Sequence, residues 1–244
     1  MEPDRSRRYQ ILETASETAK EEIIPLRCEL TELFFDLTRN LGYSNYVEMN
    51  NDLQARDFSR LAKKFKKFIK DSEKIYTELL DEYLKELVHT SRDKAHQADL
   101  SGLTRFRKYD GWFKKEKMLD ILKKTWKSLG IDFDSLESIH LDTEPRAAKI
   151  PRACVSAIDP PYDVRLTVYP TGGYNDYDNI FHESGHAVHF AHMKEDLPFE
   201  YKYWGDRGFT EGTAYLMQHL TLNRVWLKEM IGLKKADEFL RYND

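Results

Sequence analysis

Apolar residues return every three or four positions through the first half of the chain, among many charged side chains. Over residues 57–89 this spacing predicts one long amphipathic helix. Over residues 13–38 it predicts another helical segment, which Pro25 interrupts and which ends near Gly42. A third helix is expected over about 114–129.

The pattern changes after residue 130. Two stretches in which apolar, β-branched and polar residues alternate flank the turn-forming residues 159–162, and they predict a β-hairpin over 152–169. Helical spacing returns over about 176–193, after a Gly-Gly pair, and again from about residue 209. The chain is therefore expected to be mainly α, with a small antiparallel β-hairpin or sheet beside the helix that follows it.

The composition is that of a water-soluble protein. The change in pattern divides the chain into two regions, 1–130 and 131–244. The chain has 244 residues, 41% of them hydrophobic and 33% charged, with a net charge of −4. This balance gives no case for binding nucleic acid, and acidic residues soon offset the basic run at 60–70. The N-terminal sequence has no apolar run of a secretory signal, and nowhere do eighteen apolar residues follow one another. With two cysteines and no disulfide framework, a cytoplasmic protein that does not enter a membrane is expected.

The sequence His182-Glu183-Ser184-Gly185-His186 indicates a metal site. Residues four apart lie on one face of a helix, so the imidazoles of His182 and His186 can bind one ion. Glu183 lies at the edge of that face, where it can accept a proton from water activated by the metal. The motif therefore predicts one zinc ion per chain, with Glu183 as the general base.

A catalytic zinc needs a third protein ligand, and the sequence offers two candidates. His192 has the spacing of the third histidine in HExxHxxGxxH, but that arrangement needs a glycine where this chain has His189. On a continuous helix His192 faces away from His186. Glu211 follows on another helical segment, and an antiparallel pair of helices would bring its carboxylate to the ion. The predicted ligands are therefore His182, His186 and Glu211.

Other side chains near the motif have less defined roles. A tyrosine or histidine must stabilise the oxyanion of a hydrolytic reaction, and Tyr201, Tyr203 and Tyr215 are the local candidates. The pattern has no place for a fourth histidine ligand, so His189 is expected to support the site or to lie in the core. Cys154 has no activating base among its sequence neighbours and is expected to be a small buried residue.

The motif and its surroundings resemble the M3-like zinc metallopeptidases, the gluzincin group of thimet oligopeptidase and oligoendopeptidase F. The similarity extends from about Leu129 to Leu220. Besides the HExxH motif and Glu211, it includes Leu141-Asp142-Thr143-Glu144-Pro145-Arg146, the hairpin at 152–169, Pro170-Thr171-Gly172-Gly173, Asp176-Tyr177 and, more weakly, Leu41-Gly42-Tyr43-Ser44-Asn45-Tyr46.

This resemblance implies an all-helical bowl with a deep channel. Residues 1–130 would form one wall of the cleft, and residues 131–244 would form the zinc-binding catalytic region. It also implies hydrolysis of oligopeptides, with an extended substrate added to the edge strand of the hairpin. Family members are longer, and the segment after Glu211 that supplies their transition-state histidine and tyrosine is short here. The alternative is therefore a catalytically incomplete zinc-binding or helical interaction module, from a truncated family member or a fragment.

Overall fold

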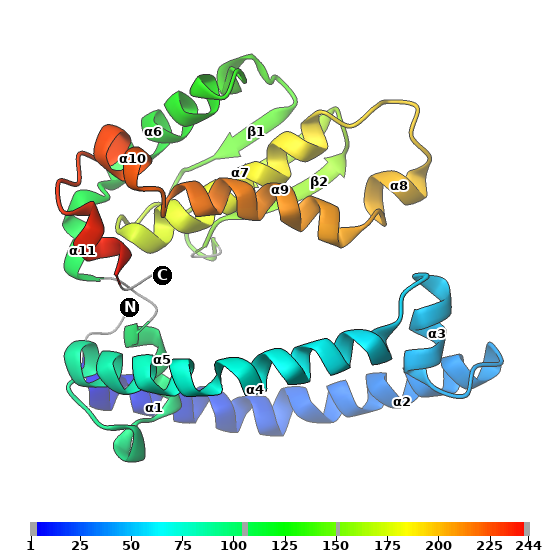
Figure 1. The fold of residues 1–244 in the computed structure, drawn as a ribbon. Helices are drawn as coiled ribbons and strands as arrows, with labels where there is room; N and C mark the ends of the chain where they lie inside the picture. Colours follow the sequence, from blue (N-terminus) through cyan, green and yellow to red (C-terminus); the bar gives the residue numbers. More distant parts are fainter. Residues whose placement is uncertain (1–3, 104–106, 150–151, 242–244) are drawn as a thin grey trace. The chain divides into compact units, whose positions relative to one another are not determined.

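The structure, a computed structural model, describes residues 4–103, 107–149 and 152–241. It is mainly α-helical with one small sheet, as the sequence pattern predicts (Figure 1). The chain divides into two compact units, unit 1 (Met1–Thr104) and unit 2 (Arg105–Asp244). The sequence pattern indicates a division near residue 130 instead. The helix before that residue belongs to unit 2, because its Trp126 indole donates a hydrogen bond to Ser184 there. No described helix is both long enough and apolar enough to cross a bilayer.

Unit 1 consists of helices connected by short turns. The long helix starts as predicted, because Asp57 accepts the Arg60 N–H at 2.8 Å, and the chain turns at Gly42, where φ is +87°. The helix does not break at Pro25. Since proline has no N–H to donate, a π-helical turn precedes it. The elements are α1 (Arg5–Thr18), η1 (Ala19–Ile23), α2 (Ile24–Asn40), α3 (Tyr46–Leu53), α4 (Phe58–Tyr83), η2 (Leu84–Val88), η3 (Arg92–Lys94) and α5 (Gln97–Leu103).

A buried carboxylate, Asp99 on α5, connects α1 to α5 in unit 1. Arg5 donates to both oxygens of Asp99, at 2.9 and 2.7 Å. The Tyr9 hydroxyl and the His96 N–H donate to the same carboxylate. These donors, Arg5 first among them, hold the pKa of Asp99 well below its ordinary value. The network is therefore a charge-assisted link within the unit.

Unit 2 is built around α7, the helix that contains the HExxH motif. Apolar side chains from the sheet, α6, α7, α9 and the C-terminal helices form one continuous core. Phe113, Tyr177, Phe181 and Phe239 are fully buried in it, and their removal from water stabilises the unit. The elements are η4 (Arg107–Trp112), α6 (Lys115–Ser128), η5 (Phe133–Ser135), β1 (Ile139–Asp142), β2 (Cys154–Asp159), β3 (Asp163–Thr167), α7 (Tyr174–Ala191), α8 (Phe199–Tyr203), α9 (Arg207–Leu220), α10 (Arg224–Trp226), η6 (Leu227–Ile231) and α11 (Ala236–Leu240).

The sheet of unit 2 has the strand order β1-β3-β2. Strands β2 and β3 form the predicted antiparallel hairpin, with Val155 opposite Leu166. Strand β1 pairs with β3 in parallel, with Leu141 opposite Leu166, so the expectation of an antiparallel sheet is wrong for this strand. A strand of four residues offers too little periodicity to be recognised from the sequence. This order leaves β2 at an edge of the sheet, in contact with α7.

Candidate metal centre

Helix α7 places the two histidines of the motif on one face. It begins at Tyr174, slightly before the predicted start at 176, because a neighbouring segment caps it. The Asp110 carboxylate accepts the Tyr174 N–H at 3.0 Å. Gly173 adopts φ +96°, and a Cβ at this position would lie 2.7 Å from that carboxylate. Asp110 is 64 residues away in sequence, so the cap could not be read from the residues around the helix.

Close packing of α9 against α7 brings the third candidate ligand to the motif. Gly185 has no side chain at the crossing, and a Cβ there would lie 2.6 Å from the Ala214 Cα. Glu211 lies on α9 about one helical turn before Ala214. The glycine inside the motif therefore lets the two helices approach closely enough for the Glu211 carboxylate to meet the histidine face.

The three predicted ligands converge at this crossing. The Nε2 atoms of His182 and His186 are 3.2 Å apart. The Glu211 Oε2 lies 3.4 Å from the Nε2 of His182 and 3.6 Å from the Nε2 of His186. A tetrahedral zinc ion with bonds of about 2.0–2.1 Å separates its ligand atoms by about 3.3 Å. Spacing and donor chemistry both fit such an ion, so His182, His186 and Glu211 are the residues that could hold it.

Each imidazole is oriented by a hydrogen bond at its other ring nitrogen. The Nδ1 of His182 lies 2.8 Å from the Gln218 Oε1, and the Nδ1 of His186 lies 2.9 Å from the Thr210 hydroxyl. The Gln218 amide donates to Asp178 at 2.9 Å, which directs the amide oxygen toward His182. A proton held on Nδ1 leaves the Nε2 lone pair free to bind a metal.

Gln218 and Thr210 are not among the residues predicted from the sequence. Gln218 follows Glu211 by two helical turns, so both lie on the same face of α9, and this spacing could have identified it. Thr210 carries no comparable signal. Burial raises the pKa of the Asp178 carboxyl. Burial also lowers the pKa of His186, and this shift favours the neutral imidazole that a metal requires.

Glu183 lies beside the ligand group without joining it. The Val155 N–H of β2 donates to its Oε2 at 2.9 Å. Burial, the largest influence, raises the pKa of the Glu183 carboxyl above its ordinary value. A carboxylate with one oxygen held in place and a pKa displaced toward neutrality is suited to proton exchange with a group at the cluster.

His189 of α7 and His192, the residue that follows α7, lie outside the ligand group. The Nδ1 of His192 lies 2.8 Å from the Val188 carbonyl oxygen, at the end of the helix. The ring of His189 packs edge-on against Phe209, with centroids 5.3 Å apart, and burial lowers its pKa. His189 is therefore a partly buried residue that packs on the exposed Phe209, and it does not belong to the buried core.

The three candidate tyrosines have different surroundings. The ring of Tyr215 meets His182 edge-on, with centroids 5.1 Å apart. Tyr203 donates its hydroxyl to the Ile158 carbonyl, and Tyr201 is exposed on α8. Tyr215 is therefore the tyrosine that lies against the ligand group. Cys154 on β2 is partly exposed rather than buried as expected.

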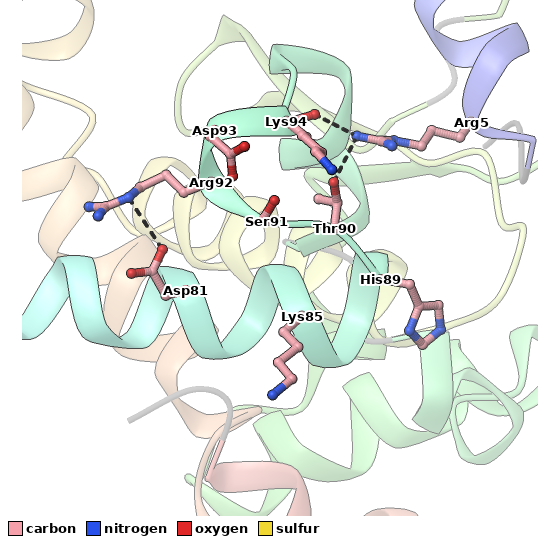
Figure 2. Close-up of a pocket in the computed structure, with 9 residues that line it drawn as sticks. All are labelled: Arg5, Asp81, Lys85, His89, Thr90, Ser91, Arg92, Asp93 and Lys94. Atoms are coloured by element: carbon pink, nitrogen blue, oxygen red, sulfur yellow. Dashed lines mark hydrogen bonds and ion pairs between the residues drawn. The ribbon is translucent and has the colours of Figure 1, made fainter.

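A separate pocket of about 930 Å³ lies in unit 1, at the end of α4 (Figure 2). Arg92 pairs with Asp81 at 3.3 Å, and Arg5 donates to the Thr90 hydroxyl and the Lys94 carbonyl. Protein groups thus already pair with both arginines in the wall of this pocket, and no ligand is proposed for it. Its lining residues are Arg5, Asp81, Lys85, His89, Thr90, Ser91, Arg92, Asp93 and Lys94.

Comparisons with known proteins bear on the fold. No protein-family model matches the chain, and no curated protein matches it. A solved structure, "The Structure of CHT", is similar, with a TM-score of 0.50 and 18% identical residues. The similarity covers 97% of this chain and 46% of that chain, so this chain spans less than half of its length. At this identity the likeness shows the fold alone.

Proposed function

We propose that this chain is a zinc-dependent peptidase that hydrolyses peptide bonds in oligopeptides. The observation that carries the proposal is the convergence of His182, His186 and Glu211 at spacings suited to a tetrahedral ion. Three protein ligands leave one position open, which is the arrangement of hydrolytic rather than structural zinc sites. Glu183, held beside this group by β2, supplies the base that such chemistry requires.

When bound, zinc would supply a Lewis acid that makes water more acidic and polarises the peptide carbonyl. Glu183 accepts the proton of the attacking water and then donates it to the leaving amine nitrogen, which returns the carboxylate to its starting form. The raised pKa of this carboxyl favours both transfers near neutral pH. The Val155 N–H holds one oxygen, so the other remains for the water. Tyr215 is the candidate donor to the oxyanion.

The position of β2 supports oligopeptides as the substrate class. This strand lies at an edge of the sheet and contacts α7. An edge strand binds a peptide in extended form through main-chain hydrogen bonds, which a short peptide can offer and a folded segment cannot.

Zinc content and peptide hydrolysis test the proposal together. Elemental analysis should find about one zinc per chain, and Glu211→Ala should lose it. Cleavage of a quenched fluorescent peptide should stop with a chelator and return with zinc. Glu183→Gln should keep its zinc and lose about 10²–10⁴-fold in turnover. Glu229→Gln, which changes an exposed carboxylate of η6, is the matched control and should leave both zinc and turnover unchanged.

The possible failures have separate meanings. A chain that binds no zinc after incubation with the metal would contradict the site itself. Zinc binding without cleavage of any peptide would favour the catalytically incomplete zinc-binding module. A fully active Glu183→Gln variant would exclude Glu183 as the base.

A further inference from the structure

Strand β2 ends in a bulge that frees a carbonyl group. The register between β2 and β3 shifts on either side of Ile158, which is therefore the extra residue of the bulge. The Ile158 carbonyl accepts a hydrogen bond from the Tyr203 hydroxyl at 3.1 Å. This bond ties α8 to the end of the same strand whose Val155 N–H holds Glu183.

Three aromatic residues at α8 form an exposed cluster at this point. The ring centroid of Phe199 lies 4.6 Å from that of Tyr203 and 5.3 Å from that of Trp204. Trp204 is 73% exposed, Phe199 is 56% exposed, and the neighbouring Ile158 is 51% exposed. Phe199, Tyr203 and Trp204, called here the aromatic cluster, thus present large apolar surfaces to solvent. Contiguous exposed apolar surface of this kind is typical of a binding site.

We propose that the aromatic cluster is a subsite for an apolar side chain of a peptide that lies along β2. The inference rests on the proposed function, because Glu183 marks the place where the peptide would react. Strand residues advance by about 3.3 Å each, so the three steps from Val155 to Ile158 span about 10 Å. A peptide paired with β2 advances at the same rate. Its side chain about three positions from the bond at Glu183 therefore reaches the aromatic cluster.

The chemistry of the cluster sets the class of side chain. Its exposed surface consists of aromatic rings, so an aromatic or large aliphatic residue gains most by burial there. The Tyr203 hydroxyl donates to the strand, and this bond holds the Tyr203 ring in place beside Phe199. The cluster selects the peptide and takes no part in the reaction.

Peptide binding to the zinc-loaded full chain tests this subsite. The chain carries Glu183→Gln so that the peptide is not consumed, and fluorescence anisotropy of labelled peptides reports affinity. The peptides have an Ala-Ser sequence in which a single Phe is moved one position at a time. We expect one position at which Phe strengthens binding about tenfold over Ser, the effect of burying an aromatic side chain. Trp204→Ala should abolish this preference. Trp112→Ala, which removes an exposed tryptophan of the same unit outside the cluster, should leave it unchanged.

The outcomes separate the subsite from the peptidase. The subsite would be overturned by equal affinity for peptides with Phe at every position. It would also be overturned if both tryptophan variants lost the Phe preference equally, or if no peptide bound. A Phe preference that disappears only with Trp204→Ala would support it. If that preference is found while the unmodified chain cleaves none of these peptides, the proposed hydrolysis fails and the subsite stands as a peptide-binding surface.

Discussion

The two units of this chain hold their helices together in different ways. In unit 2, Phe181 and Tyr177 of α7 are fully buried in a continuous apolar core. In unit 1, Phe68 and Ile69 of α4 remain 65% and 63% exposed. Few large apolar side chains are buried among the described residues of unit 1, and its most buried polar group is the Asp99 carboxylate. The stability of unit 2 therefore depends on long-range apolar packing. The stability of unit 1 depends on helix caps, helical periodicity and a polar network.

An amphipathic pattern therefore predicts a helix without predicting whether its apolar face is buried. Helical spacing predicted α4 correctly, because caps and periodicity are local properties. The same spacing does not reveal what, if anything, covers the apolar stripe. The exposed residues of that stripe are Leu61, Phe65, Phe68, Ile69, Ile75, Tyr76 and Leu79. A pattern that correctly predicts a helix can thus leave much of its apolar face exposed to solvent among the described residues.

The largest expected difference in stability is between the alanine variants of two phenylalanines, one in each unit. Phe181→Ala should lower the free energy of unfolding of unit 2 by about 3–5 kcal/mol, through lost burial and the cavity left behind. Phe68→Ala should change the stability of unit 1 by at most about 0.5 kcal/mol, because its side chain is largely in water already. All four tryptophans lie in unit 2, so their fluorescence follows its denaturant unfolding. Far-UV circular dichroism follows the helices of both units.

A large loss of stability in Phe68→Ala would contradict the difference between the two units. It would mean that the α4 stripe is covered in solution, and unit 1 would then resemble unit 2 in its dependence on apolar burial. A small loss in Phe181→Ala would contradict the assignment of this side chain to the core.

The candidate site shows what could and could not be predicted from sequence. Helical spacing places His182 and His186 on one face with Glu183 at its edge, and Glu211 is predicted because a second helix can return to that face. The structure brings the three predicted ligands together. Asp110, which caps α7, and Asp178, which directs Gln218, act across the tertiary structure. Their roles depend on the packing of α7 against its neighbours, and no local pattern contains that information.

A smaller loss of stability is expected when the polar network of unit 1, around Asp99, is disrupted. Asp99→Asn should destabilise this unit by about 2 kcal/mol, because Arg5 on α1 and the His96 N–H just before α5 lose their charged, buried acceptor. The folded-state pKa of Asp99 lies below the unfolded value, so its stabilisation is present above the ordinary carboxyl range. It is lost as pH falls through the folded-state pKa. Hydrogen exchange of α1 and α5 amides against pH should therefore show an acid-dependent loss of protection that Asp99→Asn removes.

An exposed carboxylate of the same unit provides the control. Asp71 pairs with Lys67 on the solvent side of α4, where screening by water leaves such pairs little energy. Asp71→Asn should leave the exchange profile of α1 and α5 unchanged. If both variants altered it equally, general charge effects rather than the Asp99 network would explain the pH dependence.

A smaller change, in zinc affinity, is expected from the second buried carboxylate network, that of Asp178 in unit 2. In unit 1 the Asp99 network joins helices, whereas in unit 2 Asp178 directs Gln218 toward His182. Gln218→Leu should therefore weaken zinc binding about tenfold, or about 1.4 kcal/mol, because His182 loses the acceptor that fixes its proton on Nδ1. Competition with a chromophoric chelator measures this affinity without reference to activity. The neighbouring exposed His219 provides the control, since His219→Ala should leave zinc affinity unchanged. Equal zinc affinity in Gln218→Leu and the unmodified chain would mean that α7 and α9 alone orient His182, and that the unit 2 network, like that of unit 1, serves only to join helices.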